Sequence, residues 1–121
     1  MPVRIIVCGG RDYADRAFVF QVLDKIHTLR GIAEVIQGEC QTGADRWARE
    51  WAVSMGQEPT RCPARWDLYG KRAGPLRNRH MLTLKPDGVV CFPGGKGSAD
   101  MASAATEAGV PVYYPSPSGQ S

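Results

Sequence analysis

Glycine-rich segments that also carry polar residues occur at three places in this 121-residue chain. They are residues 9–12 (GGRD), 38–43 (GECQTG) and 94–98 (GGKGS). Glycine lets the backbone approach a ligand closely, and the unpaired amides at the start of a following helix attract anions. The three segments together therefore predict a phosphate-binding edge.

The side chains in and beside these segments supply the other candidate ligand-binding groups. The amides of residues 94–98 and the Ser98 hydroxyl can hold a phosphate, and Arg11 or Arg77 can add a forked, charge-assisted hydrogen bond. Asp45 can accept hydrogen bonds from ribose hydroxyls, or can serve only as a first-turn carboxylate that the helix dipole favours. The predicted ligand-binding residues are Gly9, Gly10, Arg11, Asp12, Gly38, Glu39, Thr42, Gly43, Asp45, Trp66, Arg77, Asn78, Gly94, Gly95, Lys96, Gly97 and Ser98.

Several of these residues have an alternative explanation that the sequence leaves open. Asp12 can cap a helix instead of binding a ligand. Trp66 can stack on a base or simply pack, and Asn78 can bond a ligand or tie a loop. Glu39 is the one carboxylate in a strand-end loop that is available as a general base, and it is our sole catalytic candidate.

Short apolar runs alternate with helical patterns along the chain. Five runs predict strands, at residues 3–8, 33–37, 58–62, 89–92 and 110–114. Apolar residues at helical spacing predict helices over residues 18–29, 44–55, 75–84 and 98–108. Asp12 or Asp15 can cap the first of these helices.

This alternation predicts an α/β fold, a Rossmann-like, doubly wound, mostly parallel five-stranded sheet with strand order 3-2-1-4-5. The strand order reverses between the first and fourth strands, so their two glycine-rich loops are expected side by side. We expect a single domain over residues 1–114 and a disordered tail over residues 115–121, which are rich in Pro, Ser and Gly.

Positive charge is concentrated in one part of the chain. The net charge is +3, yet residues 61–80 hold six Lys and Arg residues against a single acid, Asp67. Such a local cluster suits an anionic small ligand or a nucleic-acid backbone. Binding of nucleic acid through residues 61–80 is therefore an alternative function, although the phosphate of a small ligand explains the cluster equally well.

Other chemistries find no support in the sequence. The cysteines Cys8, Cys40, Cys62 and Cys91 form no CxxC pair, and both histidines are isolated, so we expect neither a metal nor a cofactor. Of these thiols only Cys40 lies in a polar loop that favours reactivity. The GxGxxG and GxxxxGK[ST] motifs are absent. The apolar run at residues 5–8 is too short for a signal peptide or a membrane span, so a cytoplasmic location is expected, with no membrane partner.

Four motifs in a fixed order resemble the SLOG superfamily, and within it the YspA/YpsA-related family of uncharacterised function. They are GGRDY, GECQTGADRWA, AGPLRN and PGGKGSADM, and the likeness extends from Val3 to Tyr114. The superfamily includes the LOG phosphoribohydrolases, which cleave nucleoside monophosphates, and the DNA-binding protein DprA. The resemblance implies a nucleotide-derived ligand and a homodimer.

The LOG pattern PGGxGTxxE can be aligned with residues 93–101, where Ser98 replaces the threonine. Its catalytic glutamate position is Met101, which cannot ionise, and the neighbouring Asp100 is turned by about 100° along a helix. The resemblance thus implies phosphate binding without the acid for hydrolysis. We expect a sensor or binding module for a phosphate-bearing, nucleotide-derived ligand, with an N-glycosidase acting on a nucleotide or related sugar phosphate as the alternative.

Overall fold

The computed structural model describes residues 2–38 and 42–115 of the chain. Glu39 and Cys40, singled out above, lie outside the described residues, as do residues 116–121.

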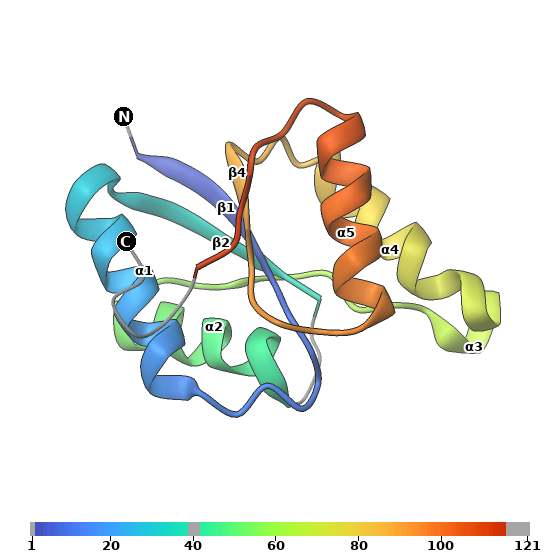
Figure 1. Ribbon diagram of the computed structural model, residues 1–121, viewed down its shortest axis with the longest axis horizontal. Coiled ribbons are helices and arrows are strands. Elements are labelled where there is room, and N and C mark those ends of the chain that lie inside the picture. The colour runs from blue at the N-terminus through green and yellow to red at the C-terminus, as the bar shows by residue number, and fades with distance from the viewer. Residues whose placement is uncertain (1, 39–41, 116–121) are drawn as a thin grey trace.

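Five parallel strands form one sheet in the order β3-β2-β1-β4-β5 (Figure 1). The strands are β1 (Val3–Cys8), β2 (Ile32–Gln37), β3 (Thr60–Arg61), β4 (Gly88–Cys91) and β5 (Val112–Tyr113). β1 lies in the centre and pairs with β2 on one side and β4 on the other. The predicted fold class and strand order are therefore confirmed, and the reversal of order falls between β1 and β4, as expected.

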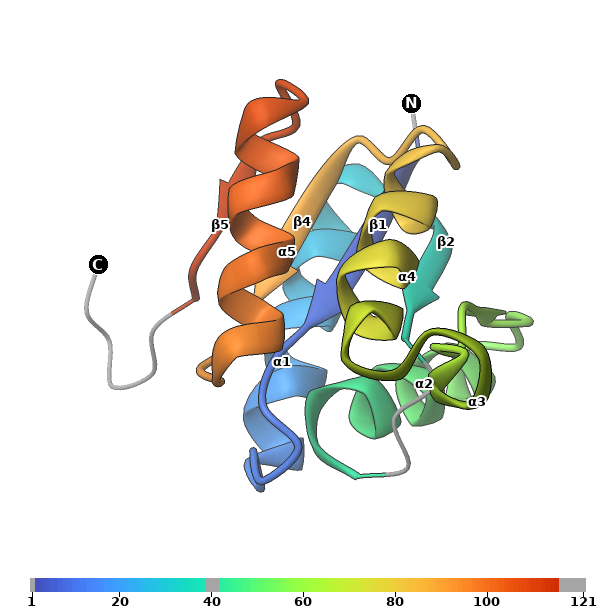
Figure 2. The ribbon, with the colours of Figure 1, turned by 90° about the vertical axis from the view of Figure 1, so that its right-hand side faces the viewer.

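Helices cover both faces of this sheet (Figures 1 and 2). On one face lie α1 (Arg16–Arg30) and α2 (Gly43–Ser54), and on the other lie α4 (Ala73–Leu82) and α5 (Lys96–Glu107). A short helix α3 (Trp66–Tyr69) and a 3-10 turn η1 (Gly70–Arg72) lead into α4. None of the helices in the described part of the chain has both the length and the apolar character needed to cross a membrane.

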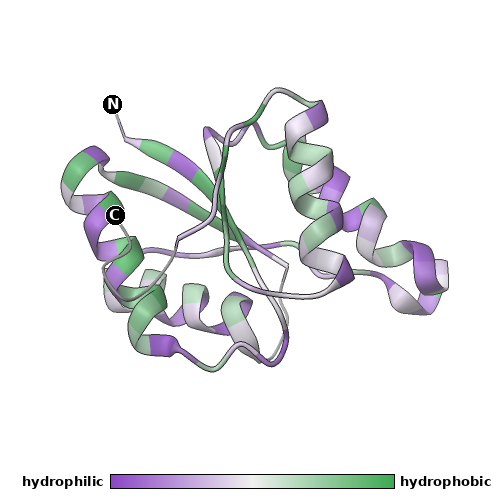
Figure 3. Ribbon diagram, viewed as in Figure 1, coloured by the Kyte–Doolittle hydropathy of each residue, from purple (hydrophilic) through white to green (hydrophobic). Residues whose placement is uncertain are grey.

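Two apolar clusters hold these layers together, one on each face of the sheet. Successive side chains of a strand point to opposite faces. Accordingly, Ile5 and Val7 of β1 pack with α1 and α2, whereas Ile6 and Cys8 pack with α4 and α5. Trp51 of α2 is fully buried, and its indole Nε1 donates to Asp24 Oδ1 at 2.8 Å. In Figure 3 the central strands are accordingly mostly coloured as hydrophobic.

Several predicted element bounds were wrong by a few residues. Helices α2, α4 and α5 begin one or two residues earlier than expected, and β3 and β5 are only two residues long. The helix α3 and the turn η1 were not predicted, because the basic segment over residues 61–80 lacks an apolar period. Residues 66–74, which precede Pro75, are therefore helical as well, and they extend the expected helix toward the cleft described below.

Candidate functional site

The loops that follow β1 and β4 lie against each other at the carboxyl edge of the sheet. The amide of Gly10 donates to the carbonyl oxygen of Pro93 at 2.9 Å, and the amide of Phe92 donates to Cys8 O at 2.8 Å. A Cβ atom at Gly94 would lie 2.5 Å from Ser98 Oγ and 2.8 Å from Gly9 C. The close contact between the two loops therefore requires glycine at position 94.

The start of α2 packs against the same place. Gly43 has a φ of +75°, and a Cβ atom there would overlap Gly10 O and lie 2.8 Å from Arg11 O. The next amide, that of Ala44, donates to Gly10 O at 3.4 Å. All three predicted loops thus meet at one edge, with the loop after β1 in the middle.

A cleft of about 660 Å³ opens between the loops after β1 and β4. This volume falls in the range of small-molecule sites, roughly 300–1,000 Å³. The cleft is lined by Cys8, Gly9, Gly10, Arg11, Asp12, Tyr13, Asp45, Trp66, Pro93, Gly94, Gly95, Lys96, Gly97 and Ser98.

The backbone amides of residues 94–98 form one wall of this cleft. Among the described residues, none of these five amides has a hydrogen-bond acceptor, and the first helical bond of α5 runs from Ala99 N to Gly95 O at 3.1 Å. Gly95, which precedes α5, supplies no side-chain cap. The helix start therefore presents unpaired donors and a partial positive charge to the cleft. Exposed Lys96 and Arg11 add two full positive charges.

Two carboxylates line the cleft as well. Asp45 lies in the first turn of α2 and is only 9% exposed, whereas Asp12 is exposed. The cap of α1 is Asp15, whose Oδ1 accepts from Phe18 N at 3.0 Å. The capping explanation for Asp12 is therefore wrong, and its carboxylate is left at the mouth of the cleft.

Trp66, the first residue of α3, forms the aromatic part of the lining. It is 49% exposed, so about half of the residue is accessible to solvent. A Cβ atom at Gly74 would lie 3.3 Å from Trp66 Cη2, which places the tip of the ring against α4. The guanidinium carbon of Arg11 lies 5.8 Å from the ring centroid, within the range of a cation–π contact. The ring is thus supported by α4 and next to a positive charge.

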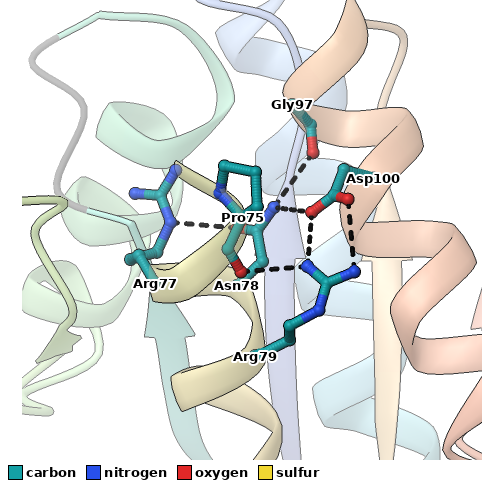
Figure 4. Close-up of polar contacts among 6 residues, drawn as sticks. All are labelled: Pro75, Arg77, Asn78, Arg79, Gly97 and Asp100. Carbon is teal, nitrogen blue, oxygen red and sulfur yellow. Dashed lines mark hydrogen bonds and ion pairs between the residues drawn. The ribbon is translucent and has the colours of Figure 1, made fainter. Parts of the chain in front are cut away.

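Arg77 and Asn78 do not line the cleft, but they join the elements around it (Figure 4). Arg77 Nη1 donates to Gly38 O at 2.8 Å, and its Nε donates to Asn78 Oδ1 at 2.9 Å. The side-chain nitrogen Nδ2 of Asn78 donates to Gly97 O at 3.2 Å and to Asp100 Oδ2 at 3.0 Å. Through these bonds α4 holds the end of β2 and the start of α5.

Asp100 completes this network. Burial raises its pKa, but hydrogen bonds from Asn78 and Arg79 outweigh that effect and leave the pKa below its ordinary value. Arg79 Nη1 lies 3.1 Å from Asp100 Oδ2. The next residue, Met101, is fully buried in the apolar cluster between α5 and the sheet. The position of the LOG glutamate therefore contributes no carboxylate to the cleft.

The structure brings most of the predicted residues together. Gly38, Thr42, Gly43, Arg77 and Asn78 lie outside the lining of the cleft. Sequence reasoning missed Cys8, Tyr13 and Pro93, which line the cleft. Each of the three directly adjoins a glycine-rich segment, and this adjacency was the available signal. Burial, with a smaller effect from Asp15, raises the pKa of the Tyr13 hydroxyl.

Comparison with known proteins identifies the family. The chain is 35% identical over 117 residues to the Gene 61 protein of Mycobacterium phage D29, an alignment that covers 90% of this chain and 93% of that protein. The model of the YspA, cpYpsA-related SLOG family matches residues 3–69, more than half of the chain. Those residues contain the loop after β1 and two further residues of the cleft lining, Asp45 and Trp66. The chain belongs to the YspA, cpYpsA-related SLOG family.

Proposed function

We propose that this protein binds a phosphate-bearing, nucleotide-derived small molecule in the cleft between the loops after β1 and β4. The observation that carries the proposal is the run of five amides at residues 94–98, which lack internal acceptors among the described residues and lie at the start of α5. Such an arrangement binds phosphate because several donors and the helix dipole act on one anion. Membership of the SLOG family supports the same ligand class.

Five side chains that line the cleft have a role in this proposal. Arg11 and Lys96 neutralise the phosphate. Trp66 stacks on the base with the accessible part of its ring, since its tip already packs against Gly74. Asp12 and Asp45, which line the same cleft, accept hydrogen bonds from ribose hydroxyls. Arg77 and Asn78 keep the walls in place without touching the ligand.

Binding is favoured over glycosidic cleavage by the surroundings of residues 100 and 101. Met101 is fully buried among apolar side chains, and the carboxylate of Asp100 is held by Asn78 and Arg79. Neither residue lines the cleft. The two carboxylates that do line it, Asp12 and Asp45, come from the loop after β1 and from α2, whereas the acid position of the LOG pattern lies in α5.

Calorimetry with adenosine monophosphate, adenosine and inorganic phosphate tests the proposal. We expect the monophosphate to bind, phosphate alone to bind more weakly and the nucleoside not to bind. At a ligand concentration 100 times the Kd, stability rises by about 2.7 kcal/mol, which a thermal-shift assay detects. ADP-ribose and a cyclic dinucleotide extend the panel to larger ligands.

Charge variants show whether the cleft is responsible. Lys96→Ala and Arg11→Ala should each weaken monophosphate binding, because each removes a positive charge beside the phosphate. Lys25→Ala removes the same charge from an exposed position on α1 and should leave binding unchanged. Equal effects of all three variants, or no binding of any ligand at millimolar concentration, would contradict the proposal.

Two other outcomes would replace it with an alternative. Release of free base from the monophosphate, detected by chromatography, would make the protein an N-glycosidase. Retardation of an oligonucleotide that falls steeply with salt, with no binding of mononucleotides, would favour nucleic-acid binding through residues 61–80.

A further inference from the structure

Cys8 and Cys91 lie side by side at the carboxyl ends of β1 and β4. They are register partners in the parallel pairing of these strands. Neighbouring strands lie about 4.8 Å apart, which falls within the Cα–Cα separation of roughly 4.4–6.8 Å that a disulfide spans. Both side chains belong to the same apolar cluster, so they are on the same face of the sheet. The Cys91 thiol donates to Phe92 O at 3.8 Å.

We propose that Cys8 and Cys91 form a dithiol site that a hydroperoxide oxidises to a disulfide. The loops of the cleft begin directly after these two residues, at Gly9 and Phe92. The site therefore couples the oxidation state of the protein to the geometry of the cleft.

The two thiols have different roles in this chemistry. The neighbouring Cys8 thiol lowers the pKa of Cys91, although burial opposes it. The neighbouring Cys91 thiol, together with burial, raises the pKa of Cys8. Because the thiolate is the nucleophile, Cys91 reacts first and Cys8 resolves the product.

Both residues can be reached from solvent through adjoining cavities. Cys8 lines the cleft, and Cys91 lines a second cavity of about 600 Å³ between α5 and the segment after β5. Both residues are buried, with exposed fractions of 8% and 7%, so the hydroperoxide would enter through these cavities. A third thiol, Cys62, belongs to the same cluster but follows β3, which β2 separates from β1. It therefore lacks a register partner among the cysteines of the described strands.

The reaction balances with one hydroperoxide for each pair. The Cys91 thiolate attacks the terminal oxygen of ROOH, the O–O bond breaks, and the alcohol ROH leaves with a proton, so that Cys91 becomes a sulfenic acid. Cys8 then attacks the Cys91 sulfur, the S–O bond breaks, and the proton of the Cys8 thiol leaves with the hydroxide as water. Two thiols and ROOH give one disulfide, ROH and water.

The disulfide should alter the cleft, because its Cβ atoms lie only about 3.5–4.5 Å apart. Closing the bond draws the ends of β1 and β4 together at the point where Gly10 and Pro93 make their hydrogen bond.

Peptide mapping tests the proposal without any ligand, so its outcome is independent of the proposed function. Trypsin places the four cysteines in four different peptides, over residues 5–11, 31–46, 62–65 and 80–96. After treatment with hydrogen peroxide we expect the thiol titre to fall by two per chain and the mass to fall by two hydrogen atoms. The linked pair should be 5–11 with 80–96, and dithiothreitol should reverse the change.

Variants sharpen the result. Cys62→Ala removes another buried thiol of the cluster and should leave the linked pair unchanged. Cys8→Ala removes the resolving thiol, so Cys91 should accumulate as a sulfenic acid that dimedone traps. A linked peptide that contains residues 31–46 or 62–65, a link between two chains, or retention of all thiols at millimolar peroxide would overturn the proposal.

Discussion

The amide of Gly10 donates a hydrogen bond of 2.9 Å to the carbonyl oxygen of Pro93, and this bond joins the loops after β1 and β4. Gly94 follows directly and packs against Gly9 and Ser98. The two loops therefore behave as one unit, so a change in either should affect the cleft between them.

Gly94→Ala should destabilise the protein by about 1–3 kcal/mol, because the added Cβ atom overlaps backbone atoms that cannot move aside. Gly95→Ala is the matched control, since a Cβ atom at position 95 meets nothing within 4 Å. Urea denaturation of both variants measures the difference. Equal stability of the two variants would contradict the contact at position 94.

Trp66→Leu should weaken monophosphate binding by about 1–3 kcal/mol, the contribution of a base stacked on an aromatic ring. It should also remove ligand-induced quenching of tryptophan fluorescence, because Trp51 is fully buried and Trp47 is packed against the core. Trp47→Phe should keep the quenching. A Trp66→Leu protein that binds as tightly as the native one would exclude stacking at this position.

Asp15→Ala should lower the free energy of unfolding by about 1 kcal/mol, because it removes the cap of α1. Asp12→Ala removes a carboxylate of the same loop that caps nothing, so its stability should match that of the native protein. Thermal denaturation followed by circular dichroism compares the two. The same Asp12→Ala protein tests the ribose contact by calorimetry.

Asp100 should make stability dependent on pH in the acid range. Its pKa is lowered in the folded state, so its contribution is present above the ordinary aspartate pKa and is lost as the pH falls through the lowered value. Asp100→Asn should therefore cost about 1 kcal/mol or less near neutral pH, and this difference should vanish in strong acid. Urea denaturation across the acid range measures it.

Asp67→Asn is the control for this pH effect. The hydrogen bond from Arg65 also lowers the pKa of Asp67, but both side chains are exposed. Solvent screens such a pair, so this substitution should leave the pH profile of stability unchanged. A difference between Asp100→Asn and the native protein that persists in strong acid would contradict the role of the charged carboxylate.

The fold could be predicted because its signals are local. Apolar runs such as Val3–Cys8 mark buried strands, and their alternation with amphipathic helices specifies a parallel sheet with right-handed crossovers. The order β3-β2-β1-β4-β5 follows from that rule and is confirmed. The short helix α3 has no such signal, because its Leu68 and Tyr69 are exposed and produce no amphipathic period.

The site could be predicted only in part. The glycines that meet at the sheet edge could be recognised because each glycine-rich loop lies close to the start of a helix in the sequence. The roles of Arg77 and Asn78 depend on partners in β2 and α5, and no local pattern encodes those contacts. The sequence likewise could not show whether Asp12 or Asp15 caps α1, because the two residues are only about one helical turn apart.

The position of β1 in the middle of the sheet has a consequence for synthesis on the ribosome. Of the five strands, β1 leaves the ribosome before the others and can pair with β2 early, but its other edge stays unpaired until β4 (Gly88–Cys91) emerges. Until that segment has left the exit tunnel, a nascent chain exposes an unpaired strand edge and lacks one wall of the cleft. The cleft thus forms only after β4 and the loop that follows it have emerged.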